Sequence, residues 1–154
     1  NNLYQRAFAA KNQGNAQLAY SLCEDILKIS PNQPEPLSLM GLILAESGRK
    51  IDALGFFTRA LEVVKDPSTF NNRGNLYQNF KQFELALDDY DEAIKRNKNF
   101  TEAYYNKGNC FKEMNSRQHI SSIFFCTCSK CTLVQVNRRV LCSSVNLRLI
   151  VSMC

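Results

Sequence analysis

The sequence predicts an all-α protein in which antiparallel helix pairs stack as a solenoid, and two regularities predict it. First, four small residues recur at intervals of 34, 33 and 34 residues: Ala7, Gly41, Gly74 and Gly108. Second, an alanine stands twelve residues after each of the first three: Ala19, Ala53 and Ala86. A period of this length is typical of repeat proteins in which each unit is a single pair of helices.

Apolar residues within each unit follow helical spacing. Leu44 lies one turn after Gly41, and Phe57 lies one turn after Ala53. The short polar segment 46–50 separates these two stretches, as expected for a tight turn between two amphipathic helices. Because one such pair cannot bury both of its faces, neighbouring units must stack against each other.

Proline-rich or polar segments mark the places where units end, because such residues do not continue a helix. They occupy residues 30–36, 65–69 and 96–100. These segments divide the array into units of about 1–33, 34–66 and 67–100, followed by the first helix of a fourth unit over 101–114. We therefore predict one helical domain over 1–114.

The segment 115–154 differs in composition from the rest of the chain. All 14 acidic residues precede it, so the net charge of +5 comes from this segment. It also holds five of the 7 cysteines: Cys126, Cys128, Cys131, Cys142 and Cys154. We predict an atypical basic, cysteine-rich tail with one capping helix over 116–128. Poorly ordered residues follow, because the β-branched residues there lack the turn residues that organise strands.

Two interpretations of this tail remain open. Four of its cysteines (Cys126, Cys128, Cys131 and Cys142) supply thiolates of the kind that bind zinc. Only Cys128 and Cys131 have the spacing of a ligand pair, however, so we predict no metal site. The other interpretation is that the segment was never selected to fold, as when an intron or a shifted reading frame is translated.

A fuller pattern surrounds the glycines of the third and fourth units. The third unit carries Gly74, Tyr77, Ala86, Tyr90 and Ala93, and the fourth begins with Tyr104, Gly108 and Phe111. On these residues the chain resembles tetratricopeptide repeat (TPR) proteins over about 1–114. The resemblance implies a right-handed superhelix. It also implies binding of a peptide or protein partner on the concave wall formed by the first helix of each unit.

Asparagines accompany the last two glycines. We predict that the residues two before and one after each glycine face the concave wall: Asn72, Asn75, Asn106 and Asn109. An amide both donates and accepts hydrogen bonds, so it can pair with the backbone of an extended peptide whatever that peptide's side chains are. In this respect the array is similar to the asparagine ladder of O-GlcNAc transferases. The alternative is that these asparagines are simply a solvated surface.

The equivalent positions in the second unit carry Leu39 and Leu42. These two leucines predict an apolar patch at one end of the groove, or else packing within the core.

Some TPR domains hold the acidic end of a chaperone with basic residues and asparagines. Here Tyr4 and Phe8 stand where a lysine and an asparagine are expected, and Asn71 and Asn75 stand where further basic residues are expected, so we do not predict this ligand.

We therefore predict a protein–protein interaction module that binds an extended peptide segment of a partner protein. The alternatives are a substrate-recruiting arm of a larger enzyme, such as a glycosyltransferase, and an oligomerisation scaffold that self-associates through its apolar C-terminal end. The sequence shows one histidine and neither a phosphate-binding loop nor a nucleophile elbow, which predicts no enzyme and no cofactor.

Nucleic acid and membrane are not predicted partners. The basic residues of the tail are dispersed and lack interleaved aromatic residues, unlike a nucleic-acid surface. Charged residues interrupt every apolar stretch before it reaches the roughly 18 to 20 residues of a spanning helix. No signal peptide is visible, so we expect a cytoplasmic location.

Overall fold

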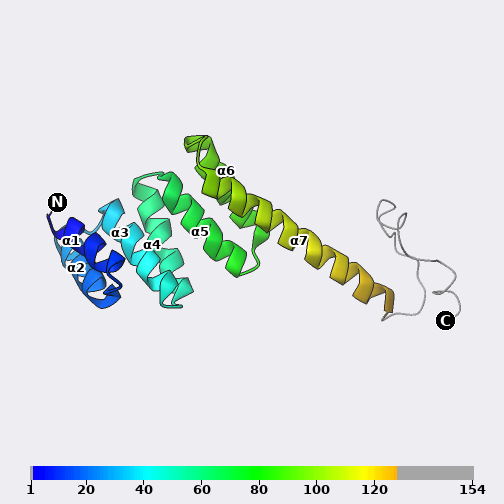
Figure 1. The fold of residues 1–154 in the computed structure, drawn as a ribbon, viewed down its shortest axis with the longest axis horizontal. Coiled ribbons are helices and arrows are strands. Elements are labelled where there is room, and N and C mark those ends of the chain that lie inside the picture. Colours follow the sequence, from blue (N-terminus) through cyan, green and yellow to red (C-terminus); the bar gives the residue numbers. More distant parts are fainter. Residues whose placement is uncertain (1, 128–154) are drawn as a thin grey trace, which may run out of the picture. The chain divides into compact units, whose positions relative to one another are not determined.

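The computed structural model describes residues 2–127, and the side chains of residues 3–116. Over this range the chain forms seven helices and no strand (Figure 1). In order they are α1 (Asn2–Asn12), α2 (Ala16–Ile29), α3 (Pro34–Glu46), α4 (Lys50–Val63), α5 (Pro67–Asn79), α6 (Phe83–Arg96) and α7 (Thr101–Thr127). The prediction of an all-α fold is confirmed. The cysteines of the zinc hypothesis lie outside the described side chains.

Consecutive helices pack in pairs, with α1 on α2, α3 on α4 and α5 on α6. The first helices of successive pairs also lie side by side, because α1 contacts α3 and α3 contacts α5. A hydrogen bond between Asn71 and Asn106 joins α5 to α7. We call the surface formed by α1, α3, α5 and residues 101–114 of α7 the first-helix wall.

The first helix of each complete pair ends close to a residue in the left-handed region. These residues are Gly14, Gly48 and Lys81, with φ of 79°, 84° and 61°, and each stands seven residues after the small residue of its unit. Asn115 stands at the same place in the fourth unit, but α7 runs through it without interruption. The predicted break before a separate helix over 116–128 is therefore absent, since Asn115 stays helical. The continuity of α7 does not test the predicted boundary between the domains 1–114 and 115–154, which stays a prediction.

Two helix starts show why the loops end where they do. The Asn15 side chain accepts a hydrogen bond from the Leu18 backbone N–H at 3.1 Å and so caps α2. The Asp66 side chain does the same for α5, accepting from the Thr69 backbone N–H at 2.8 Å. Pro67 follows directly, and a proline at this position needs no hydrogen-bonded N–H.

Glycine allows two of the helix pairs, α3 with α4 and α5 with α6, to cross at very short range. A Cβ atom added to Gly41 would lie 2.7 Å from the Phe57 ring, and one added to Gly74 would lie 2.8 Å from the Tyr90 ring. Both rings are buried, at 1% and 0% exposure. The aromatic residue of the second helix therefore occupies the space that a side chain on the first helix would need.

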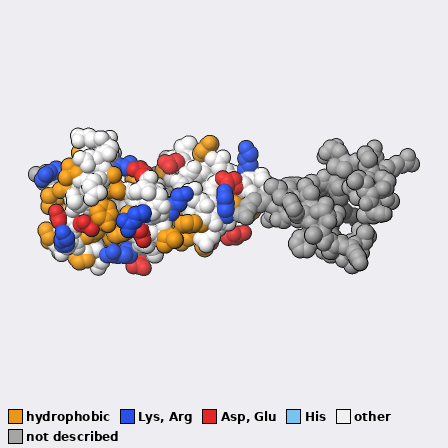
Figure 2. All heavy atoms as spheres, turned by 90° about the horizontal axis from the view of Figure 1, so that it is seen from below, with side chains coloured by type: hydrophobic (Ala, Val, Ile, Leu, Met, Phe, Trp, Pro, Cys, Tyr) orange, Lys and Arg blue, Asp and Glu red, His pale blue; other side chains and the backbone are white. Residues whose placement is uncertain are grey.

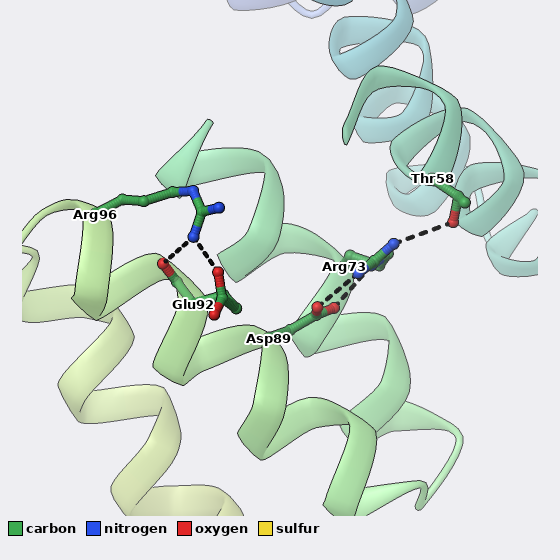
Figure 3. A network of polar contacts seen from close by, with 5 residues as sticks. All are labelled: Thr58, Arg73, Asp89, Glu92 and Arg96. Atoms are coloured by element: carbon green, nitrogen blue, oxygen red, sulfur yellow. Dashed lines mark hydrogen bonds and ion pairs between the residues drawn. The ribbon is translucent and has the colours of Figure 1, made fainter. Parts of the chain in front are cut away.

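An ion pair fixes α5 between its two neighbours (Figure 3). Arg73 donates from Nη2 and Nε to the two carboxylate oxygens of Asp89 in α6, at 2.7 and 2.8 Å. Its Nη1 donates to Thr58 Oγ1 in α4 at 3.4 Å. Because the bond to Asp89 stabilises the charged guanidinium, the pKa of Arg73 is raised. Nearby, Arg96 pairs with Glu92 and lies 4.8 Å from the centre of the Phe70 ring.

The surface of the array mixes charge signs. Figure 2 shows acidic and basic side chains interspersed with apolar ones on the face that it draws, without a field of one sign. Within residues 2–127, no helix combines the length and the apolar content needed to cross a membrane.

The glycine crossings lead to a prediction with internal controls. Replacing Gly74 by Ala should destabilise the array relative to Gly108→Ala, by about 1 to 3 kcal/mol, because the new methyl overlaps the buried Tyr90 ring. At Gly108 and Gly55 nothing lies within 4 Å of an added Cβ, so alanine there should stabilise by about 0.5 to 1 kcal/mol through helix propensity. Chemical denaturation measures all three. Equal effects at Gly74 and Gly108 would contradict the crossing.

Candidate peptide-binding surface

A polar hollow of about 340 Å³ lies on the first-helix wall, between α5, the turn that follows α5, and α7. Six side chains line it: Asn75, Gln78, Asn79, Lys81, Asn106 and Glu113. The three α5 residues are three or four positions apart, which places them on one face of the helix. The lining is thus mostly amide groups, with one cation and one anion.

The amide of Asn71 holds α7 against α5 at the edge of this hollow. Its Nδ2 donates to Glu102 Oε1 at 3.0 Å, and its Oδ1 accepts from Asn106 Nδ2 at 3.0 Å. Asn71 is 1% exposed, so leaving its amide unpaired would cost about 1 to 3 kcal/mol. This requirement fixes the position of Asn106.

The hydroxyl of Tyr90 reaches the hollow from the core. It lies 2.8 Å from Asn75 Oδ1 and 2.9 Å from Gln78 Oε1, and its single proton can be donated to either oxygen. Burial raises the pKa of the Tyr90 phenol, so the hydroxyl remains a donor at neutral pH. The side chain whose ring crosses Gly74 therefore also orients two amides of the wall.

A carboxylate closes the far side of the hollow. Glu113 accepts from Gln78 Nε2 at 2.8 Å and from Lys81 Nζ at 2.9 Å. The bond from Lys81 contributes most, and the bond from Gln78 next, to holding the pKa of Glu113 below its ordinary value. With the charge of Glu113 matched by Lys81, the lining carries no net charge.

Two polar side-chain groups of the lining take no part in the hydrogen bonds described above. Among the residues that the structure describes, neither the Asn75 Nδ2 group nor the Asn106 Oδ1 atom has a hydrogen-bond partner, although the opposite end of each amide is held. One is a donor and the other an acceptor, which is the pair of groups that a peptide backbone complements.

The structure brings together some of the predicted site residues and separates others. Asn75 and Asn106 line the hollow, whereas Asn72 and Asn109 are half-buried outside its lining. Leu42 is partly buried against the core cluster around Phe57.

The prediction for Leu39 requires correction. Its side chain is 4% exposed and packs in the core cluster with residues of α1 and α2. The reason is that the residue two before the glycine points back toward the preceding unit. Asn106 shows the same geometry, since it reaches back to Asn71.

The sequence analysis missed several residues of the site. They are Asn71, Gln78, Asn79, Lys81 and Glu113. Helical spacing from Asn75 alone identifies the three that lie on α5, because they stand three or four residues from it. Nothing in the sequence indicated the pairing of Lys81 with Glu113, which depends on where α7 packs.

Metal ligation has no support in the described part of the chain. Within it, no three residues among His, Cys, Asp and Glu are grouped closely enough to hold an ion.

Known proteins share sequence features with this chain. The family model of the tetratricopeptide repeat matches residues 67–100, which comprise α5, α6 and the loop after them. Residues 67–100 are a tetratricopeptide repeat. Human "Tetratricopeptide repeat protein 13" is 27% identical to this chain over 114 residues, which are 71% of this chain and 13% of that protein. The chain thus spans a small part of this relative's length.

Solved structures share the TPR solenoid fold. A mutant O-GlcNAc transferase from Thermobaculum terrenum superposes with a TM-score of 0.67 and 24% identity, covering 70% of this chain and 21% of the transferase. The first TPR of Spaghetti (RPAP3), bound to an HSP90 peptide, superposes with a TM-score of 0.70 and 15% identity, covering 73% of this chain and 90% of that domain. At these identities the likeness concerns the fold.

The Tyr90 hydroxyl can be tested by Tyr90→Phe. We expect a loss of about 0.5 to 1.5 kcal/mol in the free energy of unfolding, the net contribution of one hydrogen bond. The side-chain amide signals of Asn75 and Gln78 should shift in NMR spectra. Tyr105→Phe is the control, because Tyr105 is 68% exposed and should tolerate the change. Unchanged amide signals in Tyr90→Phe would show that the hydroxyl does not orient the wall.

The Glu113 carboxyl gives a pH prediction. Its NMR titration midpoint should lie below the ordinary glutamate pKa of about 4.3, because Lys81 and Gln78 stabilise the carboxylate. The stabilisation is present above that value and is lost as the pH falls through the lowered pKa. Lys81→Ala should move the midpoint upward, whereas Lys98→Ala, in the loop before α7, should not. A midpoint that is the same with and without Lys81 would contradict the contact.

Proposed function

We propose that this TPR array is a protein-interaction module that binds an extended peptide segment of a partner protein across the hollow on α5 and α7. The observation that carries the proposal is the unpaired donor on Asn75 beside the unpaired acceptor on Asn106. Both amides are held at their other ends, so binding need not order them first. An extended strand presents the matching carbonyl and N–H groups.

The character of the ligand follows from the lining. Because the hollow has no net charge, it does not favour a strongly acidic or basic peptide. Tyr105 stands on α7 where Asn71 stands on α5, three residues before the glycine, and its ring is 68% exposed. We propose that this ring, rather than Leu39, provides the apolar contact for one end of the ligand. Leu42 remains a candidate contact further along the wall.

The same proposal covers catalysis, location in the cell and nucleic-acid binding. We propose that the array itself catalyses no reaction, and that it acts in the cytoplasm. The second point is supported by Cys23 and Cys110, which are free thiols, as is usual in reducing compartments. Nucleic acid is not among the proposed partners, since the face drawn in Figure 2 mixes charge signs.

The likeness to a transferase favours a second candidate, in which the array recruits substrates to a catalytic domain. The match covers 21% of that transferase, so most of the enzyme has no counterpart in this chain. Under this candidate the same hollow would bind the substrate polypeptide, and the reading frame beyond this chain would encode a transferase domain.

Binding can be tested with peptides selected by display on the full chain, followed by calorimetry. Changing Asn75 and Asn106 to Ala together should weaken the selected peptide about five- to a hundredfold, as expected for two hydrogen bonds. The matched control changes Asn72 and Asn109 to Ala, which removes the same groups from the same helices outside the hollow. Its affinity should remain unchanged.

Peptide analogues provide the complementary measurement. Methylation of the backbone N–H that pairs with Asn106 should weaken binding as much as the double substitution does. The proposal is wrong if no peptide is selected. It is also wrong if both double variants bind equally, or if backbone methylation has no effect.

A further inference from the structure

Gly108 lies on a helix face that is covered in the second and third units and open in the fourth. The first helices α3, α5 and α7 each carry a large apolar residue four positions before the glycine and another three positions after it. In α3 these are Leu37 and Leu44, at 0% and 2% exposure, and in α5 they are Phe70, at 6%, and the partly buried Tyr77. In α7 they are Tyr104 and Phe111, which are 52% and 41% exposed. We call Tyr104, Gly108 and Phe111 the open face of α7.

The complete units show what such a face accommodates. The second helix of each pair places an aromatic ring on the glycine, Phe57 on Gly41 and Tyr90 on Gly74, at 2.7 and 2.8 Å from the missing Cβ. Nothing lies within 4 Å of the same position at Gly108. Among the residues that the structure describes, none therefore fills in the fourth unit the site that receives a ring in the second and third.

The covering helices share a sequence pattern as well as a geometry. Each has an alanine four residues before the ring and another three residues after it: Ala53 and Ala60 in α4, and Ala86 and Ala93 in α6. All four alanines are buried, at 1% exposure or less. Small residues on both sides of the ring let the two helix backbones approach.

We propose that the open face of α7 binds an amphipathic helix of a partner protein that carries an aromatic residue between two alanines, in the spacing that α4 and α6 share. The partner's ring would sit on Gly108, and its alanines would lie beside Tyr104 and Phe111. This surface is separate from the hollow, so it would serve a second partner segment, helical rather than extended.

Neighbouring contacts leave room for this helix. Lys107 pairs with Asp91 and lies 5.8 Å from the centre of the Phe111 ring, where it covers part of one side. The buried side of α7 is already in use, since Ala103 and Cys110 are fully buried in the core clusters of α5 and α6. Tyr104 and Phe111 directly follow these two residues, about 100° further around the helix, and so lie outside the buried side.

The test uses the full chain and a fluorescent peptide with the sequence of residues 83–96, which contains Ala86, Tyr90 and Ala93. Fluorescence anisotropy should show saturable binding, and replacing the tyrosine of the peptide by alanine should abolish it. In the full chain, Gly108→Leu should weaken binding by about tenfold or more, because the added side chain occupies the place of the ring. Gly55→Leu is the matched control, as Gly55 is exposed on a helix with nothing within 4 Å.

Several outcomes would overturn the proposal. It fails if the peptide does not bind, if the alanine peptide binds equally well, or if Gly108→Leu behaves like Gly55→Leu. Sedimentation at several concentrations adds a further check: self-association that Gly108→Leu abolishes would make a second copy of this chain the occupant. If Tyr104 and Phe111 are protected from solvent in the monomer without peptide, the chain's own later residues cover the face, and the proposal is again wrong.

Discussion

The array depends on the contact between a glycine of one helix and an aromatic ring of the next. At 2.7 to 2.8 Å from the missing Cβ, the rings of Phe57 and Tyr90 leave no room for a side chain on Gly41 or Gly74. The distance between the two helices of a pair is set by this contact, because a buried ring cannot move aside without disturbing the close-packed core around it. The second and third units repeat this contact, since the ring stands sixteen residues after the glycine in both.

In the third unit the same ring also organises the polar surface. Tyr90 differs from Phe57 by one hydroxyl, and that hydroxyl reaches Asn75 and Gln78 on the first-helix wall. The second unit has no such group, and the position that corresponds to Asn75 there is Leu42. The wall therefore changes from apolar to polar along the array together with the aromatic residue beneath it. In the third unit, the core thus supplies the partner that orients Asn75 and Gln78 on the wall.

The sequence predicted the parts of this structure that repeat. Spacing alone identified the helix pairs, because small and apolar residues recur at the same positions of each unit, whereas the contacts of the Phe57 and Tyr90 rings with Gly41 and Gly74 were found only in the structure. Side-chain direction was predicted less well: Leu39 and Asn106 point toward the preceding unit, and which residues meet there depends on packing between units. The same limit applies to the buried amide of Asn71. The continuity of α7 was missed because asparagine at residue 115 tolerates both a helical and a left-handed backbone, whereas the equivalent Gly14 and Gly48 favour the turn. Lys81, at this place in the third unit, adopts the left-handed conformation although it is not glycine.

The two proposed surfaces share one helix, and this connects them physically. α7 contributes Asn106 and Glu113 to the hollow and packs into the core through Ala103 and Cys110, while Tyr104 and Phe111 stay exposed. A helix bound to the open face would bury Tyr104 and Phe111 and so stabilise the packed position of α7. Because the hollow exists only while α7 keeps that position, a helix on the open face favours the conformation that binds an extended peptide. Linkage then requires the converse, so that a peptide in the hollow strengthens binding of the helix by the same factor.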